Sequence, residues 1–270
     1  MSKTILITGS TDGIGKLAAI KFAKDGHKVY LHGRNSEKLD NVITEIQKLS
    51  NNQKVKGFVA DFSDLDAVKK MGQQVNEEVP KLDVLINNAG IFKTPAALTK
   101  DGLDIRFAVN YFAPFILTEA LLPLLQKGTA PRIINLSSAA QAPVSYDALS
   151  GKSPLHEQAA YAQSKLALTM WSFHLAKAQN DITVIALNPG SLLNTNMVRE
   201  AYGKFWSPAD KGANIIYGLA VSEEYKDITG KYFDNDKGAK VGAFGDAHQD
   251  AYDDEEIEKL MAVTKEIIAD

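Results

Sequence analysis

The sequence predicts an α/β protein in which a doubly wound, parallel sheet of about seven strands lies between two layers of helices. Short apolar runs alternate along the chain with longer segments in which apolar residues recur at helical spacing. The short runs are apolar at nearly every position, as expected for strands that helices cover on both faces. A glycine-rich turn follows the first run, which is typical of the passage from strand to helix in this fold class.

The elements follow one another in a regular order. Strands are expected at residues 4–8, 27–32, 55–60, 82–86, 132–136, 182–187 and 231–233. Helices are expected at residues 14–24, 36–49, 64–79, 103–126, 158–179, 208–221 and 253–269. Pro114 should kink the fourth helix, and residues 139–157 are expected to form a loop. The spacing suits one continuous sheet, so we predict a single domain over residues 1–270.

Composition and charge exclude several classes of protein. The 270 residues include no cysteine, so disulfides, thiolate metal sites and a cysteine nucleophile are excluded. A formal net charge of −3 provides no field that would attract nucleic acid. The five histidines show no metal-ligand spacing, and we expect no metal. No apolar stretch suits a secretory signal or a membrane span, so we expect a cytoplasmic protein without membrane contact.

The turn after the first strand indicates a dinucleotide site. Its Gly-x-x-x-Gly-x-Gly spacing allows a tight turn and a close approach of the backbone to a pyrophosphate. The helix that follows presents free N–H groups at its positive end. The residues expected to contact the cofactor here are Gly9, Ser10, Thr11, Asp12, Gly13, Ile14 and Gly15. A purely structural strand-to-helix turn is the alternative.

The ends of the next three strands favour NADP over NAD. An NAD site needs a carboxylate after the second strand, but the chain has Arg34 there, which can contact a 2′-phosphate. A solvent-facing arginine is the alternative. Asp61, beside Phe62, can accept a hydrogen bond from the adenine amino group, or it can cap the following helix. The small residues of Asn88-Ala89-Gly90 allow the adenosine side of the cofactor to lie close.

Four residues suggest proton transfer. Tyr161 and Lys165 share one face of a helix. A nearby ammonium group lowers the pKa of a phenol, so this tyrosine can exchange a proton with a substrate oxygen. Ser138 follows the fifth strand and can hold that oxygen, and Asn110 can hold a water that relays protons from Lys165. An aromatic ring packed on a lysine stem is the alternative.

Together these residues resemble the short-chain dehydrogenase/reductase family. The matching motifs are Thr8-Gly9-x-x-x-Gly13-Ile14-Gly15, Asp61, Asn87-Asn88-Ala89-Gly90, Asn110, Ser138, Tyr161-x-x-x-Lys165 and Asn188-Pro189-Gly190. The resemblance implies a Rossmann-type fold, a nicotinamide cofactor, and a catalytic tetrad of Asn110, Ser138, Tyr161 and Lys165. It also implies that Lys165 holds the nicotinamide ribose, that Pro189 and Gly190 turn the chain around the nicotinamide, and that Thr195 contacts its amide.

Two further features narrow the resemblance. The gap between Ser138 and Tyr161 and the segment at residues 230–233 resemble the retinol-dehydrogenase-like and WW-domain-oxidoreductase-like branch, which often favours NADP. The family commonly associates through its long helices, so we expect a homo-oligomer, either a dimer or a tetramer.

Residues 191–207 are expected to form a lid over the nicotinamide. Its aromatic and aliphatic side chains can close over an apolar compound and exclude water. We therefore expect an NADP(H)-dependent oxidoreductase that interconverts a carbonyl and an alcohol on a lipophilic or aromatic small molecule. One alternative is that the lid residues only pack against the protein. Another is a non-catalytic NADP-binding sensor or scaffold.

Overall fold

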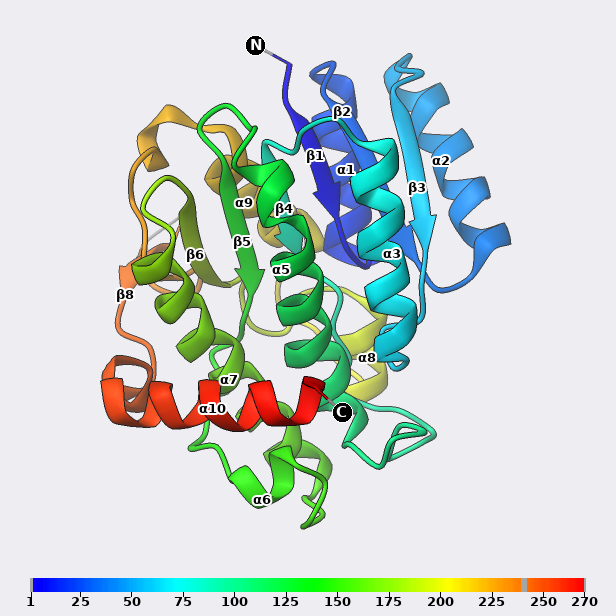
Figure 1. The fold of residues 1–270 in the computed structure, drawn as a ribbon. Helices are drawn as coiled ribbons and strands as arrows, with labels where there is room; N and C mark the ends of the chain where they lie inside the picture. Colours follow the sequence, from blue (N-terminus) through cyan, green and yellow to red (C-terminus); the bar gives the residue numbers. More distant parts are fainter. Residues whose placement is uncertain (1, 239–241, 270) are drawn as a thin grey trace.

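The computed structural model describes residues 2–238 and 242–269 (Figure 1). Its strands are β1 (Thr4–Ile7), β2 (Lys28–Gly33), β3 (Val55–Val59), β4 (Val84–Asn87), β5 (Arg132–Leu136), β6 (Thr183–Asn188), β7 (Lys231–Asp234) and β8 (Ala243–Gly245). Its α-helices are α1 (Gly13–Lys24), α2 (Ser36–Ser50), α3 (Leu65–Glu78), α4 (Ile105–Phe107), α5 (Ala113–Leu125), α6 (Tyr146–Leu149), α7 (Glu157–Ala178), α8 (Asn196–Tyr202), α9 (Ala209–Val221) and α10 (Asp254–Ala269). A π-helical turn, η1 (Ala108–Phe112), and two 3₁₀ turns, η2 (Glu223–Tyr225) and η3 (Gln249–Tyr252), complete the elements.

The described strands form one sheet in the order β3-β2-β1-β4-β5-β6-β7-β8. All neighbours are parallel except β7 and β8. The order reverses between β1 and β4, and ligands of doubly wound sheets bind beside the carboxyl ends of the strands at such a reversal. The predicted fold class is confirmed. The eighth strand was not predicted, because Phe244 is its one large apolar residue and shows no strand pattern between Ala243 and Gly245.

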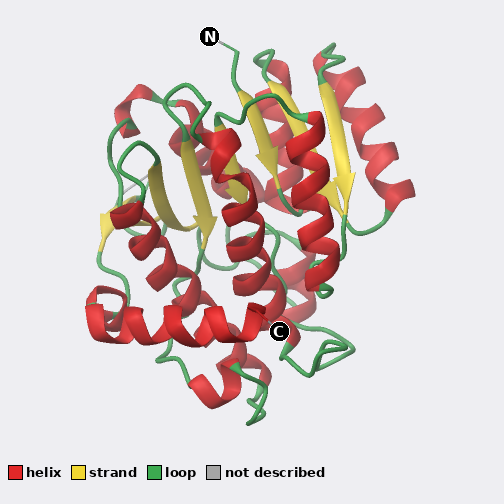
Figure 2. Cartoon of the chain, viewed as in Figure 1, coloured by secondary structure: helices red, strands yellow, loops and turns green. Residues whose placement is uncertain are grey.

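Helices cover both faces of the sheet, as Figure 2 shows. Alternate residues of each strand point to opposite faces. Ile5 and Ile7 of β1 therefore pack in the core under α1, α2 and α9, whereas Leu6 packs in the core under α3, α5 and α7. These two cores bury the strands on both faces, and the strand ends carry the predicted site residues.

The terminal helix α10 adds cover on one side only. It lies across α7 (Figure 1) and buries Ile257, Leu260 and Met261 in the second core. The Tyr111 and Thr264 hydroxyls hydrogen-bond each other at 2.7 Å in the interior. α10 therefore belongs to the same packed unit as the sheet.

The predicted helix at residues 103–126 is built differently from expectation. The π-helical turn η1 precedes Pro114, where a simple kink was predicted. Proline has no N–H, so it cannot donate to the carbonyl of Asn110 four residues earlier, and the turn there is widened. Among the described residues, Ile105–Leu125 is also the one helical stretch long and apolar enough to cross a membrane, but most of it is buried inside the fold.

Candidate functional site

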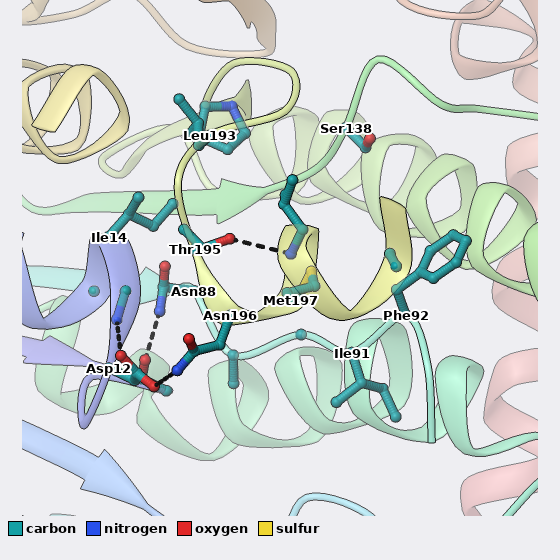
Figure 3. Close-up of a pocket in the computed structure, with 18 of the residues that line it drawn as sticks. Asp12, Ile14, Asn88, Ile91, Phe92, Ser138, Leu193, Thr195, Asn196 and Met197 are labelled. Atoms are coloured by element: carbon teal, nitrogen blue, oxygen red, sulfur yellow. Dashed lines mark hydrogen bonds between the residues drawn. The ribbon is translucent and has the colours of Figure 1, made fainter. Parts of the chain in front are cut away.

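A cavity of about 720 Å³ opens along the carboxyl ends of the strands. The glycine-rich turn, the ends of β2 and β3 and the lid all line it, and Figure 3 shows Asn196 of the lid beside Asp12 of the turn. Ser138 and Tyr161 lie on its wall. The cavity thus joins the predicted dinucleotide turn to two of the predicted catalytic residues.

The glycine-rich turn rests directly on the end of β4. A Cβ atom at Gly9 would lie 2.7 Å from the Ala89 Cα, and one at Gly15 would lie 2.4 Å from Asn88 Nδ2. The Asn88 amide also donates to the carbonyls of Thr8 and Gly9, at 2.8 and 2.9 Å. Both glycines are therefore required by the packing of turn against strand, whatever lies in the cavity.

Ser10 does not lie where the sequence predicts. Its hydroxyl donates to the carbonyl of Ile7 at 2.8 Å and accepts from the N–H of His32 at 3.0 Å, so it faces the interior. Ser10 is fully buried and does not line the cavity. The prediction of Ser10 as a cofactor contact is wrong for its side chain, which instead stabilises the turn.

His32 is a structural residue of the site that sequence reasoning missed. Its Nδ1 accepts from the N–H of Gly9 at 3.0 Å, and Nε2 lies 3.0 Å from the carbonyl of Ala60, so Nε2 carries the proton. Its ring stacks on Phe62 at 4.1 Å. Burial lowers the pKa of His32 to about 4, and a neutral ring suits both bonds. A histidine at a strand end was the available signal.

The predicted adenosine end has cationic neighbours. Arg34 lines the main cavity and also an adjoining hollow of about 540 Å³. Lys38, not predicted from the sequence, lines that hollow and pairs with Asp12 at 3.4 Å. Asp61 borders the cavity, but its Oδ1 accepts from both the N–H and the hydroxyl of Ser63, at 2.9 and 2.7 Å. Asp61 therefore closes the turn before α3, whereas Asp64 caps the helix by accepting from the N–H groups of Asp66 and Ala67.

Tyr161 and Lys165 lie on α7 beside the end of β5. The Lys165 Nζ donates to the carbonyl of Leu136 at 2.7 Å and lies 5.7 Å from the centre of the Tyr161 ring. A Cβ atom at Gly90 would lie 3.3 Å from this amine, so Gly90 leaves room for it. The carbonyl of Ser138 accepts from the Tyr232 hydroxyl at 2.9 Å, which fixes the serine backbone.

The ionisation of this pair differs from the sequence-based expectation. Burial raises the pKa of Tyr161, although the nearby Ser138 hydroxyl acts in the opposite direction. Burial also lowers the pKa of Lys165 to about 7, which weakens the positive charge that was expected to favour the phenolate. Burial is thus the largest influence on both groups in the protein alone, and the lowering of the tyrosine pKa by lysine stays a prediction.

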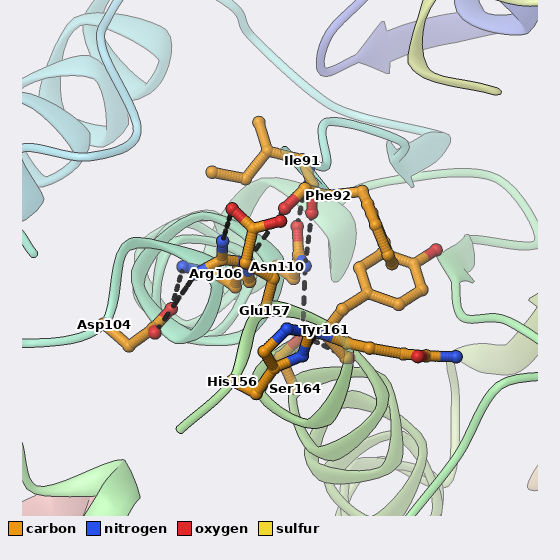
Figure 4. A network of polar contacts seen from close by, with 10 residues as sticks. Ile91, Phe92, Asp104, Arg106, Asn110, His156, Glu157, Tyr161 and Ser164 are labelled. Atoms are coloured by element: carbon orange, nitrogen blue, oxygen red, sulfur yellow. Dashed lines mark hydrogen bonds and ion pairs between the residues drawn. The ribbon is translucent and has the colours of Figure 1, made fainter. Parts of the chain in front are cut away.

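Asn110 is held firmly within η1. Its Oδ1 accepts from the N–H of Ile91 at 2.8 Å, and its Nδ2 donates to the Ile91 carbonyl and to the Ser164 hydroxyl, each at 3.0 Å (Figure 4). Both hydrogens of the side-chain amide are therefore used within the protein, and the water relay that the sequence suggested for Asn110 stays a prediction. Pro114 has no N–H to donate to the main-chain carbonyl of Asn110, which makes this carbonyl a candidate acceptor for such a relay.

The lid at residues 191–207 contains the unpredicted helix α8. Figure 3 shows the Asn196 amide reaching the Asp12 carboxylate, at 2.6 Å, so the lid is tied to the glycine-rich turn. Thr195 lines the cavity, and its hydroxyl caps α8 by accepting from the N–H of Val198 at 3.4 Å. Pro189 and Gly190 line the cavity where the lid begins.

The apolar lid residues fall into two groups. Leu193 is buried, as the packing alternative requires. Tyr202, Phe205 and Trp206 are instead exposed, Trp206 by 72%. Tyr202 and Trp206 also line the cavity. Packing against the protein therefore does not explain these three side chains. Within the described ranges, no cluster of three histidine, aspartate or glutamate residues could hold a metal ion.

Comparison with known proteins identifies the class. The model of the short chain dehydrogenase family matches residues 3–204, so the chain belongs to this family. Retinol dehydrogenase 13 of Homo sapiens is 34% identical over 253 residues, which cover 86% of this chain and 76% of that protein. A short chain dehydrogenase from Escherichia coli CFT073 complexed with NADPH is 29% identical, with a TM-score of 0.70, over 87% of this chain and 97% of that chain. A protein from Mycobacterium paratuberculosis is 25% identical, with a TM-score of 0.80, and the match covers 98% of this chain and 92% of that chain.

These similarities confirm the predicted family and its retinol-dehydrogenase-like branch. The chain is therefore an oxidoreductase of the short chain dehydrogenase family. The relatives do not identify the compound that this chain converts or its catalytic residues, so both remain predictions.

Proposed function

We propose that the chain binds NADP(H) and uses it to interconvert a carbonyl and an alcohol on a lipophilic or aromatic small molecule. One observation carries this proposal: a single cavity joins the glycine-rich turn and Arg34 to Ser138 and Tyr161. The NADPH complex of the related E. coli structure supports the choice of cofactor.

The residues of the cavity fit the nucleotide. The N-terminus of α1 and its preceding turn would hold the pyrophosphate, and Arg34 would hold the 2′-phosphate. The Lys165 amine uses one of its three N–H groups on Leu136, which leaves donors for the ribose hydroxyls. Thr195 and Gly190 would flank the nicotinamide. When bound, this ring supplies or accepts the hydride.

The chain's own residues would move the proton. Ser138 would hold the substrate oxygen by hydrogen bonding, and the Tyr161 hydroxyl would donate its proton to that oxygen during reduction. Its raised pKa keeps Tyr161 protonated at neutral pH. Lys165 would supply the proton that restores Tyr161, and Asn110 would hold a water that resupplies Lys165.

The substrate end of the cavity is apolar and aromatic. Phe92, Met197, Tyr202 and Trp206 line it. Such walls favour flat or aliphatic carbonyl compounds over sugars and small polar acids. The name of the related retinol dehydrogenase supports the same substrate class.

The test is NADPH oxidation by the wild type and by Tyr161→Phe across a panel of aldehydes and ketones. We expect turnover of aromatic and long-chain aldehydes and a loss of about 10²-fold or more in the variant. Equal rates would reject Tyr161 as the proton donor, and activity confined to sugars or polar acids would reject the substrate class. Tight NADPH binding without turnover would favour the non-catalytic sensor.

We further propose a cytoplasmic, homo-oligomeric protein. Because α10 lies across α7, an oligomer would use a surface beyond the part that α10 covers. Light scattering of the purified chain tests the assembly, and imaging of a fluorescent fusion in cells tests the location. A single-chain mass or membrane-bound fluorescence would overturn these two proposals.

A further inference from the structure

A buried arginine lies behind the cavity wall, outside the predicted tetrad. Arg106 is 2% exposed and belongs to α4. Its Nε donates to the main-chain carbonyl of Phe92 at 2.8 Å, and its Nη1 contacts the carboxylate of Asp104 at 3.2 Å. Its Nη2 lies 3.1 Å from the carboxylate of Glu157, the first residue of α7 (Figure 4). One guanidinium thus connects the segment after β4 to the helix that carries Tyr161.

Phe92 is the residue that this arginine holds. Its ring lies edge-on to Tyr161, with 4.9 Å between ring centres, and tilted against Tyr202 of the lid, at 5.7 Å. The side chain is buried and lines the cavity. Phe92 therefore contacts the proposed proton donor on one side and the lid on the other.

Two residues of one helical stretch, Arg106 and Asn110, hold the backbone around Phe92. Asn110 fixes both polar groups of the Ile91 peptide, and Arg106 fixes the next carbonyl along the chain, that of Phe92. Together they immobilise the backbone on both sides of the Phe92 Cα. The ring position then depends on one side-chain rotation, which the contacts with Tyr161 and Tyr202 restrict.

We propose that Arg106 is a positioning residue, which sets the place of Tyr161 and the width of the substrate site through Phe92 and Glu157. This inference rests on the proposed function, because it assigns Tyr161 the proton transfer. The planar guanidinium is suited to the task, since it satisfies a carbonyl and two carboxylates in fixed directions. A lysine at this position would keep the charge but lose the geometry.

Arg132 provides a matched control. It is also a buried arginine, 1% exposed, and its Nη1 donates to a main-chain carbonyl, that of Leu219, at 2.8 Å. It is the first residue of β5, at the amino-terminal ends of the strands, whereas the cavity lies at their carboxyl ends. Arg132→Lys should therefore destabilise the fold as Arg106→Lys does, but without moving Phe92 or Tyr161.

The experiment compares Arg106→Lys, Glu157→Gln and Arg132→Lys with the wild type. The measurements are thermal stability, the Kd for NADPH from its fluorescence, and kcat and KM with an aromatic and a long-chain aldehyde. In Arg106→Lys we expect kcat to fall by about tenfold or more and KM to change differently for the two aldehydes, because a misplaced proton donor slows the reaction steeply. The Kd for NADPH should change by less than about twofold, since the variant leaves the turn at residues 9–15 intact. Glu157→Gln, whose half-exposed side chain permits folding, should show a smaller change in the same direction.

Arg132→Lys should lower the melting temperature and leave kcat and KM unchanged. If Arg106→Lys behaves in the same way, the positioning role is overturned. A readout independent of turnover is the ¹⁹F signal of fluorotyrosine-labelled protein, with Tyr161 assigned by its loss in Tyr161→Phe. A shifted Tyr161 signal in Arg106→Lys, in a protein without measurable turnover, would support the positioning of Tyr161 and reject the proposed function. An unshifted signal with unchanged kinetics would reject the inference alone.

Discussion

The two buried groups of α7 set the pH dependence expected of the reaction. Because burial raises the pKa of Tyr161, its phenol stays protonated through neutral pH and can donate. Carbonyl reduction should therefore fall as pH rises past this pKa, whereas alcohol oxidation, which needs the phenolate, should rise over the same range. Steady-state rates in both directions, measured from neutral pH to above the ordinary phenol pKa of about 10, check this prediction. Parallel profiles in the two directions would contradict it.

His32 should make the glycine-rich turn sensitive to acid. Its pKa is about 4 in the folded protein, below the ordinary value of 6.5, so between these values the unfolded chain binds more protons. Its contribution to the free energy of unfolding is therefore complete above pH 6.5 and is lost as pH falls toward 4, by about 3 kcal/mol in all. Denaturant unfolding at pH 4.5 to 7.5 should show a weaker pH dependence in His32→Gln than in the wild type.

His27→Gln provides the control for this prediction. Burial also lowers the pKa of His27, and its Nδ1 accepts from the N–H of Lys3, far from the cavity. Protonation of His32 breaks its bond to the N–H of Gly9 in the turn that would hold the cofactor, so acid should weaken NADPH binding by the wild type. His27→Gln leaves that bond in place and should show the same loss of binding. NADPH affinity that falls to the same extent in His32→Gln would show that His32 does not link acid to the turn.

Arg34 should carry the preference for a phosphorylated cofactor. Arg34→Ala should weaken NADPH binding by about tenfold or more, because a charge-assisted bond to the 2′-phosphate is lost. NADH lacks that phosphate, so its Kd should stay unchanged and serves as the control. Equal weakening for both nucleotides, measured by fluorescence titration, would mean that Arg34 does not read the phosphate.

At the scale of single residues, the sequence predicts a functional residue when its partner lies a few positions away in the chain. Tyr161 and Lys165 are one helical turn apart, and the structure places both beside the cavity. The roles of Ser10 and Arg106 could not be predicted, because each depends on a carbonyl or N–H group of a different strand or loop. His32 offered one signal, its place at a strand end, but its partners Gly9 and Ala60 are set by the fold. The raised pKa of Tyr161 was also beyond reach, since it depends on how deeply α7 is buried.

Among the elements, the lid is the clearest case of a segment that serves the site more than the fold. Trp206 lines the cavity although 72% of it is exposed. Trp206→Ala should therefore change the free energy of unfolding by less than about 0.5 kcal/mol. It should raise KM for a long-chain aldehyde, because an apolar wall is removed. Phe205→Ala is the control, since Phe205 is exposed but does not line the cavity, and it should leave KM unchanged. Equal KM values in wild type and Trp206→Ala would remove Trp206 from the substrate site.

Elements were predicted well where their pattern was long and poorly where it was short. α2 and α3 carry apolar residues at regular spacing, and they lie within a residue or two of their expected bounds. The helices α6 and α8 have seven residues or fewer, and their stability depends on capping by Ser145 and Thr195 and on contacts with the rest of the fold. The π-helical turn at Asn110 could not be predicted, because Pro114 alone is equally consistent with a kink.

At the scale of the whole molecule, the order of the strands is what brings the motifs together. Parallel connection places the carboxyl ends of β1 to β7 along the same side of the sheet, so turns far apart in sequence meet there. Alternation alone therefore predicted both the fold class and the location of the site. The antiparallel β8 and the placement of α10 depend on contacts made late in the chain, for which the sequence offers no local signal.

The position of α10 also bears on how the molecule is made. This helix is synthesised after every other described element, yet Tyr111 near the middle of the chain hydrogen-bonds to it. Until α10 arrives, a nascent chain exposes the part of the hydrophobic surface of α7 that this helix covers. Nascent chains that are stalled before α10 has been synthesised should therefore bind chaperones or aggregate more than complete chains do.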